Sequence, residues 1–241
     1  MRATSVTGLS AGGAAGTSLP RAGATASFEA APAMGHRAAP EPHVLYDKSK
    51  RLIDAVLSIA LLVLSVPVLA IAGIAIVLTT RRSPVLVQRR VGHLGREFPM
   101  LKLRTMCPGA SDEPETPLVP GEVFVAKTPD DPRVTSIGRL LRRTSIDELP
   151  QLLNVLAGQM SLVGPRPALP AEVARYPGSW QRRLAVKPGL TGLWQVSGRS
   201  DVPPRRRAAI DRYYVRHRSL ALDCTILLRT FAATLSMRGA W

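Results

Sequence analysis

The sequence predicts a mixed α/β protein, mostly helical, that is carried on a membrane-inserted hairpin near its N-terminus. Three observations predict it. Residues 55–80 are 26 consecutive uncharged residues, nearly all Leu, Val, Ile and Ala, which is enough to enter a bilayer. The 160 residues after Arg81 show apolar residues at helical spacing and only brief strand-like alternation. The formal net charge of +15 predicts a surface that attracts anions.

Residues 1–43 are expected to be a disordered tail, because they are dominated by Ala, Gly, Ser, Thr and Pro and show no apolar periodicity. The tail has no unbroken apolar stretch of the kind that a secretory signal requires. The two cysteines, Cys107 and Cys224, are far apart and have no Cys or His neighbours at ligand spacing. They exclude a disulfide framework and a structural zinc site, and they fit a reducing compartment.

Residues 44–85 are predicted to form a re-entrant membrane hairpin. Basic residues flank the apolar run on both sides, so both ends are expected at the cytoplasmic face. These residues are Lys48, Lys50, Arg51, Arg81, Arg82, Arg89 and Arg90. Pro67 removes one backbone hydrogen bond near the middle of the run, and Ser65 is placed to satisfy the freed carbonyls. Each arm of such a hairpin reaches roughly 18 Å, too short to cross; a spanning helix with a proline kink is the alternative.

Residues 86–241 are predicted to form one small, mostly helical α/β domain. Short strands are expected at Val85–Val87 and around Phe98–Met106, where β-branched residues and weak alternation occur. Helical spacing predicts three helices, with a glycine, Gly158, directly after the first of them. These helices are Glu148–Ala157, Ala208–Tyr214 and Asp223–Ser236.

Two adjacent acids, Asp147 and Glu148, stand in the run T-S-I-D-E-L-P-Q from Thr144 to Gln151. A capping box with Ser145 as N-cap would place Pro150 at the fifth helical position, which proline tolerates poorly. A helix that starts near Asp147 keeps the proline in the first turn. Asp147 is then either a helix cap or a group that acts in chemistry.

The neighbourhood of the two acids favours phosphate chemistry. Several arginines precede them, and Arg166 follows between two prolines that restrict its backbone. A guanidinium held in this way suits bidentate phosphate binding. One acid is expected to attack phosphorus, and the other to hold a divalent metal that screens the diphosphate. Taken singly, each arginine is better explained as a solvated surface charge.

A series of motifs runs along the chain from Tyr46 onward. They are Ser65 and Pro67 in the hairpin, S-P-V-L-V-Q-R-R-V-G from Ser83, L-K-L-R-T-M from Leu101, D-P-R-V-T-S-I-G-R from Asp131, R-R-T-S-I-D-E-L-P-Q-L-L-N-V-L-A-G from Arg142, M-S-L-V-G-P-R-P from Met160, K-P-G-L-T-G from Lys187, and a closing helix from Asp211. In these motifs and in their order the chain resembles the bacterial sugar transferases that act as monotopic polyprenyl-phosphate phosphoglycosyl transferases and initiate exopolysaccharide synthesis.

The resemblance implies a two-step reaction. Asp147 attacks the β-phosphorus of a UDP-sugar and releases UMP, and polyprenyl phosphate, such as undecaprenyl phosphate, then attacks the sugar-phosphoryl aspartate. Glu148 matches the acid associated with Mg²⁺, and Arg166 matches the phosphate-binding arginine of the G-P-R-P loop. Lys102, Arg104 and Arg142 are carried over only as phosphate-contact candidates.

The family fold is a small α/β catalytic domain on a re-entrant helix, with amphipathic helices at the membrane interface. Tyr213, Tyr214 and the basic charges around them fit such a helix. The implied location is the bacterial inner membrane, with the catalytic domain in the cytoplasm and membrane lipid as a partner. A homodimer is left open.

Departures from the family pattern leave the acid pair intact. Val66 separates Ser65 from Pro67, and Gln159 stands where an acid is commoner. Arg218 and Ala221 replace frequent tryptophans.

Two other functions compete with the transferase: a basic membrane-anchored adaptor without catalysis, and a degenerate transferase that serves as a scaffold. Aromatic residues make up only 5% of the chain, which argues against stacking on nucleic acid, so no nucleic-acid partner is expected. The intact acid pair and Arg166 weigh against a degenerate scaffold.

Overall fold

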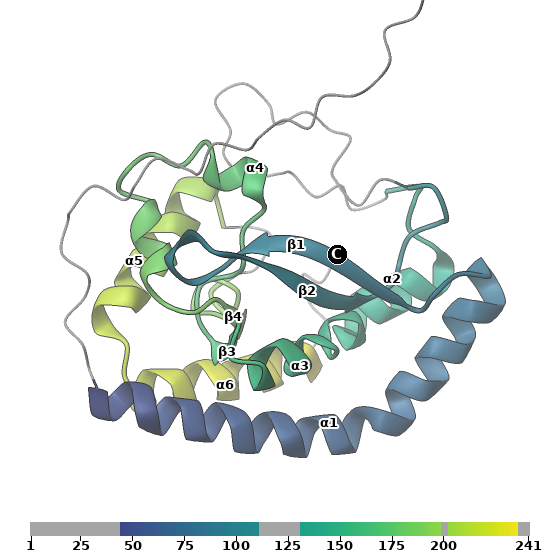
Figure 1. Cartoon of the computed structure of the whole chain (residues 1–241), viewed down its shortest axis with the longest axis horizontal. Helices are drawn as coiled ribbons and strands as arrows, with labels where there is room; N and C mark the ends of the chain where they lie inside the picture. The colour runs from purple at the N-terminus through teal and green to yellow at the C-terminus, as the bar shows by residue number, and fades with distance from the viewer. Residues whose placement is uncertain (1–43, 111–130, 199–201, 236–241) are drawn as a thin grey trace, which may run out of the picture. The chain divides into compact units, whose positions relative to one another are not determined.

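The computed structural model describes residues 44–110, 131–198 and 202–235, and the predicted tail at 1–43 lies outside these ranges. The α-helices are α1 (Val44–Thr80), α2 (Ser136–Thr144), α3 (Gln151–Leu156), α4 (Pro170–Val173), α5 (Pro204–His217) and α6 (Leu220–Leu235). The strands are β1 (Val85–Val91), β2 (Glu97–Leu103), β3 (Ser161–Val163) and β4 (Gly189–Thr191). Helices therefore predominate, as the sequence predicts, and the strands form two small sheets (Figure 1).

Helix α1 is one continuous helix of 37 residues that includes Pro67, and its ribbon bends along its length (Figure 1). At about 1.5 Å per residue it reaches roughly 55 Å, longer than the hydrocarbon core of a bilayer. The helix thus continues through the proline and is not interrupted there. Ser65 Oγ donates to the Leu62 carbonyl at 3.0 Å, one residue before the carbonyl that Pro67 leaves without its N–H partner. The return of both helix ends to one face of a membrane stays a prediction.

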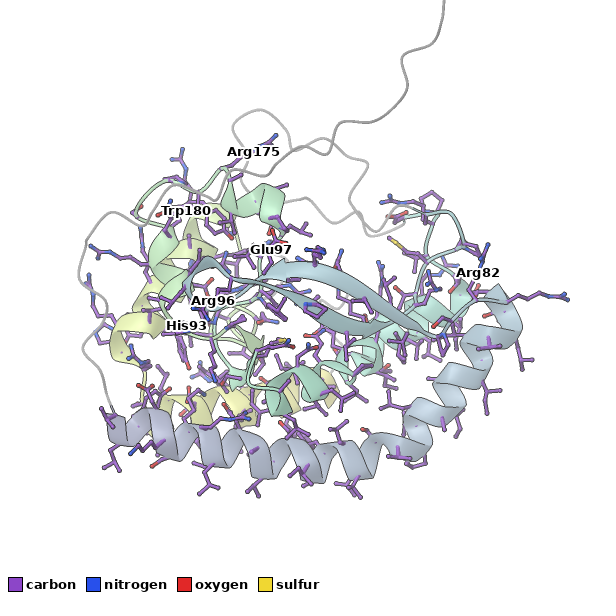
Figure 2. All side chains as sticks on the ribbon, in the orientation of Figure 1. Arg82, His93, Arg96, Glu97, Arg175 and Trp180 are labelled. Atoms are coloured by element: carbon purple, nitrogen blue, oxygen red, sulfur yellow. The ribbon has the colours of Figure 1, made fainter. Side chains whose placement is uncertain are left out.

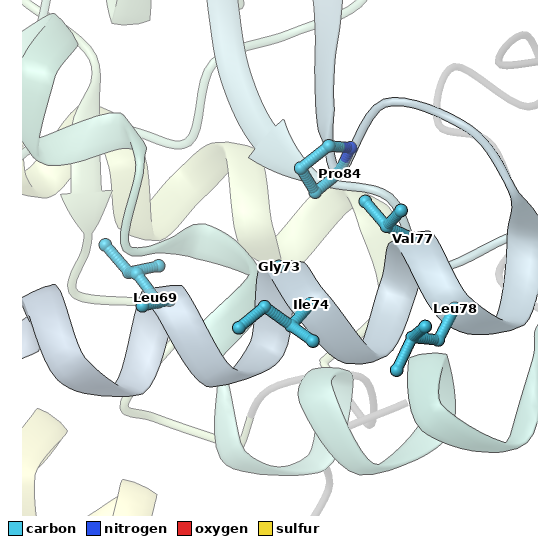
Figure 3. A pocket seen from close by; sticks show the side chains of 7 residues that line it. Leu69, Gly73, Ile74, Val77, Leu78 and Pro84 are labelled. Carbon is cyan, nitrogen blue, oxygen red and sulfur yellow. The ribbon is translucent and has the colours of Figure 1, made fainter.

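The burial of α1 is the reverse of that in a helix from a water-soluble protein. Its polar residues Asp54, Ser58 and Ser65 are buried against the rest of the chain, whereas Leu64 and Leu78 are 73% and 75% exposed. An open apolar groove of about 440 Å³ runs along its second half, lined by Leu69, Ala70, Gly73, Ile74, Val77, Leu78 and Pro84 (Figure 3). By length and composition α1 alone, among the described helices, could cross a membrane. Helix α1 therefore turns apolar side chains outward and buries polar ones, which indicates that lipid surrounds this helix.

The first half of α1 is joined to the residues that follow it by polar contacts. Arg51 donates to the carbonyls of Val155 and Leu156, both at 2.6 Å, and so satisfies the C-terminal end of α3. Asp54 accepts the Leu162 N–H at 3.2 Å. Farther along, Ile76 joins a small apolar cluster with Leu103 and Leu141. Helix α1 therefore shares polar contacts and core with the residues that follow it.

Strands β1 and β2 form an antiparallel hairpin in which Leu86 pairs with Lys102 and Arg90 with Phe98. Residues that pair across such a ladder, and those two apart along a strand, share a face. Arg90 and Lys102 consequently lie on the same face of the hairpin. Strand β1 is longer than the predicted strand Val85–Val87. Strand β2 ends at Leu103, earlier than the predicted end at Met106.

Helix α3 begins at Gln151 instead of Glu148, which corrects the predicted start. Residues Ile146–Glu148 form a 3-10 turn, in which the N–H of Leu149 donates to the Ile146 carbonyl at 3.2 Å. The N–H groups of Leu152 and Leu153 likewise donate three residues back, to the carbonyls of Leu149 and Pro150, so the tighter 3-10 pattern persists up to the start of α3. Gly158 follows the helix with a φ of 77°, a conformation that suits glycine beyond a C-terminus, as predicted.

The last two helices are longer than predicted, and one interfacial expectation is wrong. Tyr214 is 2% exposed and its hydroxyl lies 2.8 Å from Asp223 Oδ1, so it belongs to the core rather than to a membrane interface. Tyr213, in contrast, is 54% exposed. The main core also contains Phe98, Met100, Leu152, Val155, Met160, Leu162, Val163 and Ile226.

Asn154 ties α3 to β2, and its replacement should destabilise the fold. Its side chain accepts the Leu101 N–H at 3.0 Å and donates to the Pro99 carbonyl at 2.7 Å. Asn154→Ala leaves both backbone groups unsatisfied, and we expect a loss of about 2–4 kcal/mol, measured by unfolding in detergent. The exposed neighbour Leu153→Ala is the matched control, with a change below about 1 kcal/mol. Equal losses for the two variants would contradict this role of Asn154.

Candidate active site

The two acids lie on a turn whose backbone is fixed on both sides. Ser145 adopts a φ of 59° at the end of α2, and the 3-10 turn then carries Asp147 and Glu148 toward Pro150. The N-cap of α3 is Pro150, with no side-chain capping hydrogen bond. The capping interpretation of Asp147 therefore does not apply to α3, and both acids are half-buried rather than fully exposed.

Glu148 is paired with Arg166. Both terminal nitrogens of the Arg166 guanidinium donate to Glu148 Oε1, each at 3.2 Å. The two side chains are 23% and 25% exposed, so the ion pair is reachable from solvent. This ion pair joins the G-P-R-P loop to the 3-10 turn that carries the two acids, although Glu148 and Arg166 are 18 residues apart in sequence.

The loop that carries Arg166 is fixed through four consecutive carbonyls. Pro165 accepts from the Gly189 N–H at 2.9 Å, and Ala168 from the Val91 N–H at 2.9 Å. Between them, the carbonyl of Arg166 accepts from Arg183 at 3.0 Å and that of Pro167 from Arg90 at 3.4 Å. With two prolines adding fixed φ angles, this backbone presents Arg166 in one orientation.

Close backbone packing beneath the loop requires glycine at Gly164. A Cβ there would lie 2.5 Å from the Lys187 carbonyl oxygen and 2.8 Å from the Gly189 nitrogen. The G-P-R-P and K-P-G-L-T-G motifs are thus two halves of one packed unit, joined by the parallel pairing of β3 with β4. Sequence reasoning identified both motifs without predicting that they meet.

The β1–β2 hairpin adds two basic side chains to the site, Arg90 and Lys102. Burial lowers the pKa of Lys102 well below its ordinary value, and the positive charges of Arg90 and Arg166 lower it further, whereas Glu148 and Asp147 oppose the shift. Burial, and then Arg166, lowers the pKa of Arg90 to about 10, which leaves it charged at neutral pH. Such crowding of cations is relieved when an anion binds among them.

Arg142 approaches the acids from α2. Its Nε donates to Thr105 Oγ1 at 2.9 Å. Burial lowers the pKa of Arg142, while the nearby carboxylate of Asp147 acts in the opposite direction. The structure thus brings together five of the predicted residues, namely Asp147, Glu148, Lys102, Arg142 and Arg166.

Arg104 is the predicted residue whose described contacts lie elsewhere. Its Nε donates to the Ser83 carbonyl at 3.0 Å, and its backbone N–H donates to the Pro84 carbonyl, so it holds the connection between α1 and β1. Its role as a phosphate contact stays a prediction. Ser65 and Pro67 lie in α1, as described above.

Arg90 was not predicted as a site residue, although it lies in the motif S-P-V-L-V-Q-R-R-V-G. Arg90 Nη2 donates to Gln88 Oε1 at 2.7 Å, which fixes the guanidinium on the face that carries Lys102. The signal was the spacing of two between Gln88 and Arg90 on a strand, which puts them on one face. Other arginines lie around the periphery, such as Arg82 after α1 and Arg175 after α4 (Figure 2).

The two acids, Asp147 and Glu148, fit a magnesium ion only if substrate phosphates supply its other ligands. Among the described residues, no group of three His, Cys, Asp or Glu side chains could hold a metal ion. Mg²⁺ is commonly held by one or two carboxylates together with substrate phosphates. Asp147 and Glu148 supply carboxylates of that kind, beside cations that would hold the phosphates.

Comparison with known proteins gives a consistent result. The family described as bacterial sugar transferase matches residues 45–237. A UDP-galactose-lipid carrier transferase of Erwinia amylovora is 42% identical over 198 residues, which cover 80% of this chain and 41% of that protein.

Two further relatives are matched over more of their length. The exopolysaccharide production protein ExoY of Sinorhizobium fredii is 40% identical over 80% of this chain and 88% of its own. A UDP-glucose:undecaprenyl-phosphate glucose-1-phosphate transferase of Caulobacter vibrioides is 43% identical over 84% of this chain and 75% of its own. The chain therefore spans less than half of the Erwinia relative but most of the other two.

Proposed function

This chain belongs to the bacterial sugar transferase family, and on that premise we propose that it transfers a sugar 1-phosphate from a UDP-sugar to polyprenyl phosphate and releases UMP. The observation that carries the proposal is the acid pair set among four cations, with Glu148 held by Arg166. A carboxylate nucleophile beside phosphate-binding cations is what phosphoryl transfer through a covalent intermediate requires. The reaction is the first membrane step of exopolysaccharide or glycoconjugate synthesis.

In the first step a carboxylate oxygen of Asp147 attacks the β-phosphorus of the donor. The bond between that phosphorus and the oxygen bridging to the α-phosphate breaks, and UMP leaves with this oxygen. Asp147 is then joined to the sugar phosphate as a mixed anhydride. In this proposal Arg166, Arg90 and Lys102 hold the phosphoryl oxygens as charge develops on them.

In the second step an oxygen of polyprenyl phosphate attacks the same phosphorus. The anhydride bond to Asp147 breaks, the free carboxylate is restored, and the product is a polyprenyl diphosphate sugar. Glu148 would hold Mg²⁺, which supplies charge neutralisation for the diphosphate.

The lipid substrate explains why such a site is joined to α1. We place the chain in the bacterial inner membrane, with the catalytic segment on the cytoplasmic side, where UDP-sugars are found. The contacts of Asp54 with β3 and of Arg51 with α3 would hold the acids at a set height above the membrane.

The proposal is tested by release of UMP from membranes that contain the protein. Labelled UDP-galactose, UDP-glucose and other UDP-sugars are supplied one at a time, with and without undecaprenyl phosphate. We expect UMP release and a labelled lipid product with one of them. A membrane-anchored adaptor without catalysis would release no UMP with any donor.

The prediction for topology concerns Pro67. After replacement of the exposed residues Cys107 and Cys224 by Ser, single cysteines at Lys48 and Arg82 should react from the same side of sealed vesicles. Pro67→Leu restores the missing N–H, so α1 should straighten and bring the two labels to opposite sides. Val66→Leu, at an exposed neighbouring position, is the control and should change nothing. Labels on opposite sides in the unaltered protein would favour a spanning helix.

A further inference from the structure

We propose that Arg183 is a positioning residue for Arg166, and that Asp211 of α5 holds Arg183 in place from outside the site. The inference rests on the proposed function in one respect, which is that Arg166 binds a phosphoryl group. Neither Arg183 nor Asp211 belongs to the acid pair or to the cations around it, and neither was a candidate on sequence grounds.

Arg183 donates a side-chain hydrogen bond to the backbone of Arg166 itself. Its Nη2 donates to the Arg166 carbonyl at 3.0 Å. The neighbouring carbonyls of Pro165 and Ala168 are held by backbone N–H groups, and that of Pro167 by the longer contact from Arg90. Loss of Arg183 would therefore free the loop at the residue whose side chain carries the function.

The Arg183 guanidinium is fully surrounded by protein. Its side chain is 3% exposed, and it connects three parts of the chain: the 3-10 turn that carries it (Gln181–Ala185), Tyr176 and α5. Nη1 donates to Tyr176 Oη at 2.6 Å, and Nη2 lies 2.8 Å from Asp211 Oδ2. Three partners in different directions use the fixed fork of a guanidinium, which an ammonium group cannot reproduce.

Asp211 supplies the charge that allows a cation to remain there. Its side chain is 1% exposed, and burial raises its pKa to about 6, while Arg183 opposes the shift. A buried cation without its partner is strongly unfavourable, so Arg183 would lose its place without Asp211. Helix α5, which contacts this turn, is in this way connected through two side chains to the loop of Arg166.

A double substitution separates positioning from folding. Arg183→Met with Asp211→Leu removes both charges together and leaves apolar groups of similar size, which buried ion pairs commonly tolerate. We expect the protein to keep its unfolding temperature within a few degrees, while kcat falls about 10- to 100-fold and KM for the donor changes less. Arg182→Met, at the exposed neighbouring arginine, is the matched control and should keep full activity.

The decisive measurement repeats the double substitution in an Arg166→Ala background. If Arg183 acts through Arg166, the change should then have little further effect on turnover, because the positioned group is already absent. An equal loss in both backgrounds overturns the inference in favour of a general structural role. Full activity of Arg166→Ala itself would instead contradict the phosphate-binding role of Arg166 and, with it, that part of the proposed function.

A conservative variant keeps the test independent of folding. Arg183→Lys retains the charge opposite Asp211 but cannot hold Tyr176, Asp211 and the Arg166 carbonyl together. We expect intermediate activity, between the double variant and the unaltered protein, with the same dependence on Arg166. Full activity of Arg183→Lys would show that charge alone suffices and would overturn the positioning role.

Discussion

Replacement of Asp147 by Asn should abolish turnover, with a loss of more than about 1,000-fold. A neutral amide cannot attack phosphorus, and the neighbouring carboxylate, Glu148, is engaged by Arg166. The side chain lies in a 3-10 turn outside α1, so the protein should remain folded and membrane-bound. UMP release from matched amounts of membrane protein measures the effect.

A trapping experiment makes the role of Asp147 specific. With labelled donor and no polyprenyl phosphate, the unaltered protein should retain label and release at most one UMP per molecule. The Asn variant should retain none. Turnover above a few per cent of normal in the Asn variant would remove Asp147 from the nucleophile role.

Replacement of Glu148 by Gln should reduce turnover by about 100-fold or more and raise the Mg²⁺ concentration needed for half-maximal rate. The amide keeps the shape of the side chain but removes the charge that Arg166 contacts at 3.2 Å. Arg166 would then lose its fixed partner, and the metal a ligand. A titration of UMP release against Mg²⁺ measures both effects.

The control for Glu148 is Glu97→Gln. Glu97 is an exposed acid on β2 that pairs with Arg89 at 3.4 Å, so its loss should leave activity and Mg²⁺ dependence unchanged. An unaltered Mg²⁺ requirement in the Glu148 variant would count against a metal-binding role, even if turnover falls.

Secondary structure could be predicted from the sequence where residue spacing or the backbone preference of a single residue determines it. The helical segments, the strand near Val85 and the termination at Gly158 were predicted from spacing and glycine. The start of α3 was not, because the effect of Pro150 depends on whether the residues before it form a 3-10 or an α-turn. Spacing likewise could not tell that Tyr214 faces the core while Tyr213 faces outward.

For the site, adjacency in sequence was a better guide than charge. Asp147, Glu148 and Arg166 were found from local motifs, and the structure brings them together. Arg90 and Arg183 were missed because each acts through a contact with a distant loop carbonyl, at Pro167 and at Arg166. In an arginine-rich chain the sequence does not show which arginine contacts a distant backbone carbonyl, although the spacing of Gln88 and Arg90 did place those two on one face.

The reversed burial of α1 has a practical consequence for anyone who would prepare this enzyme without detergent. A protein shortened to begin after Thr80 would lose Arg51 from the end of α3 and Asp54 from the Leu162 N–H. It would also expose Leu103 and Leu141, which pack against Ile76. We expect such a truncation to aggregate instead of yielding a soluble catalytic domain, because the anchor is also part of the enzyme's interior. Purification must therefore keep the lipid-facing helix, and with it a micelle or nanodisc, around the molecule.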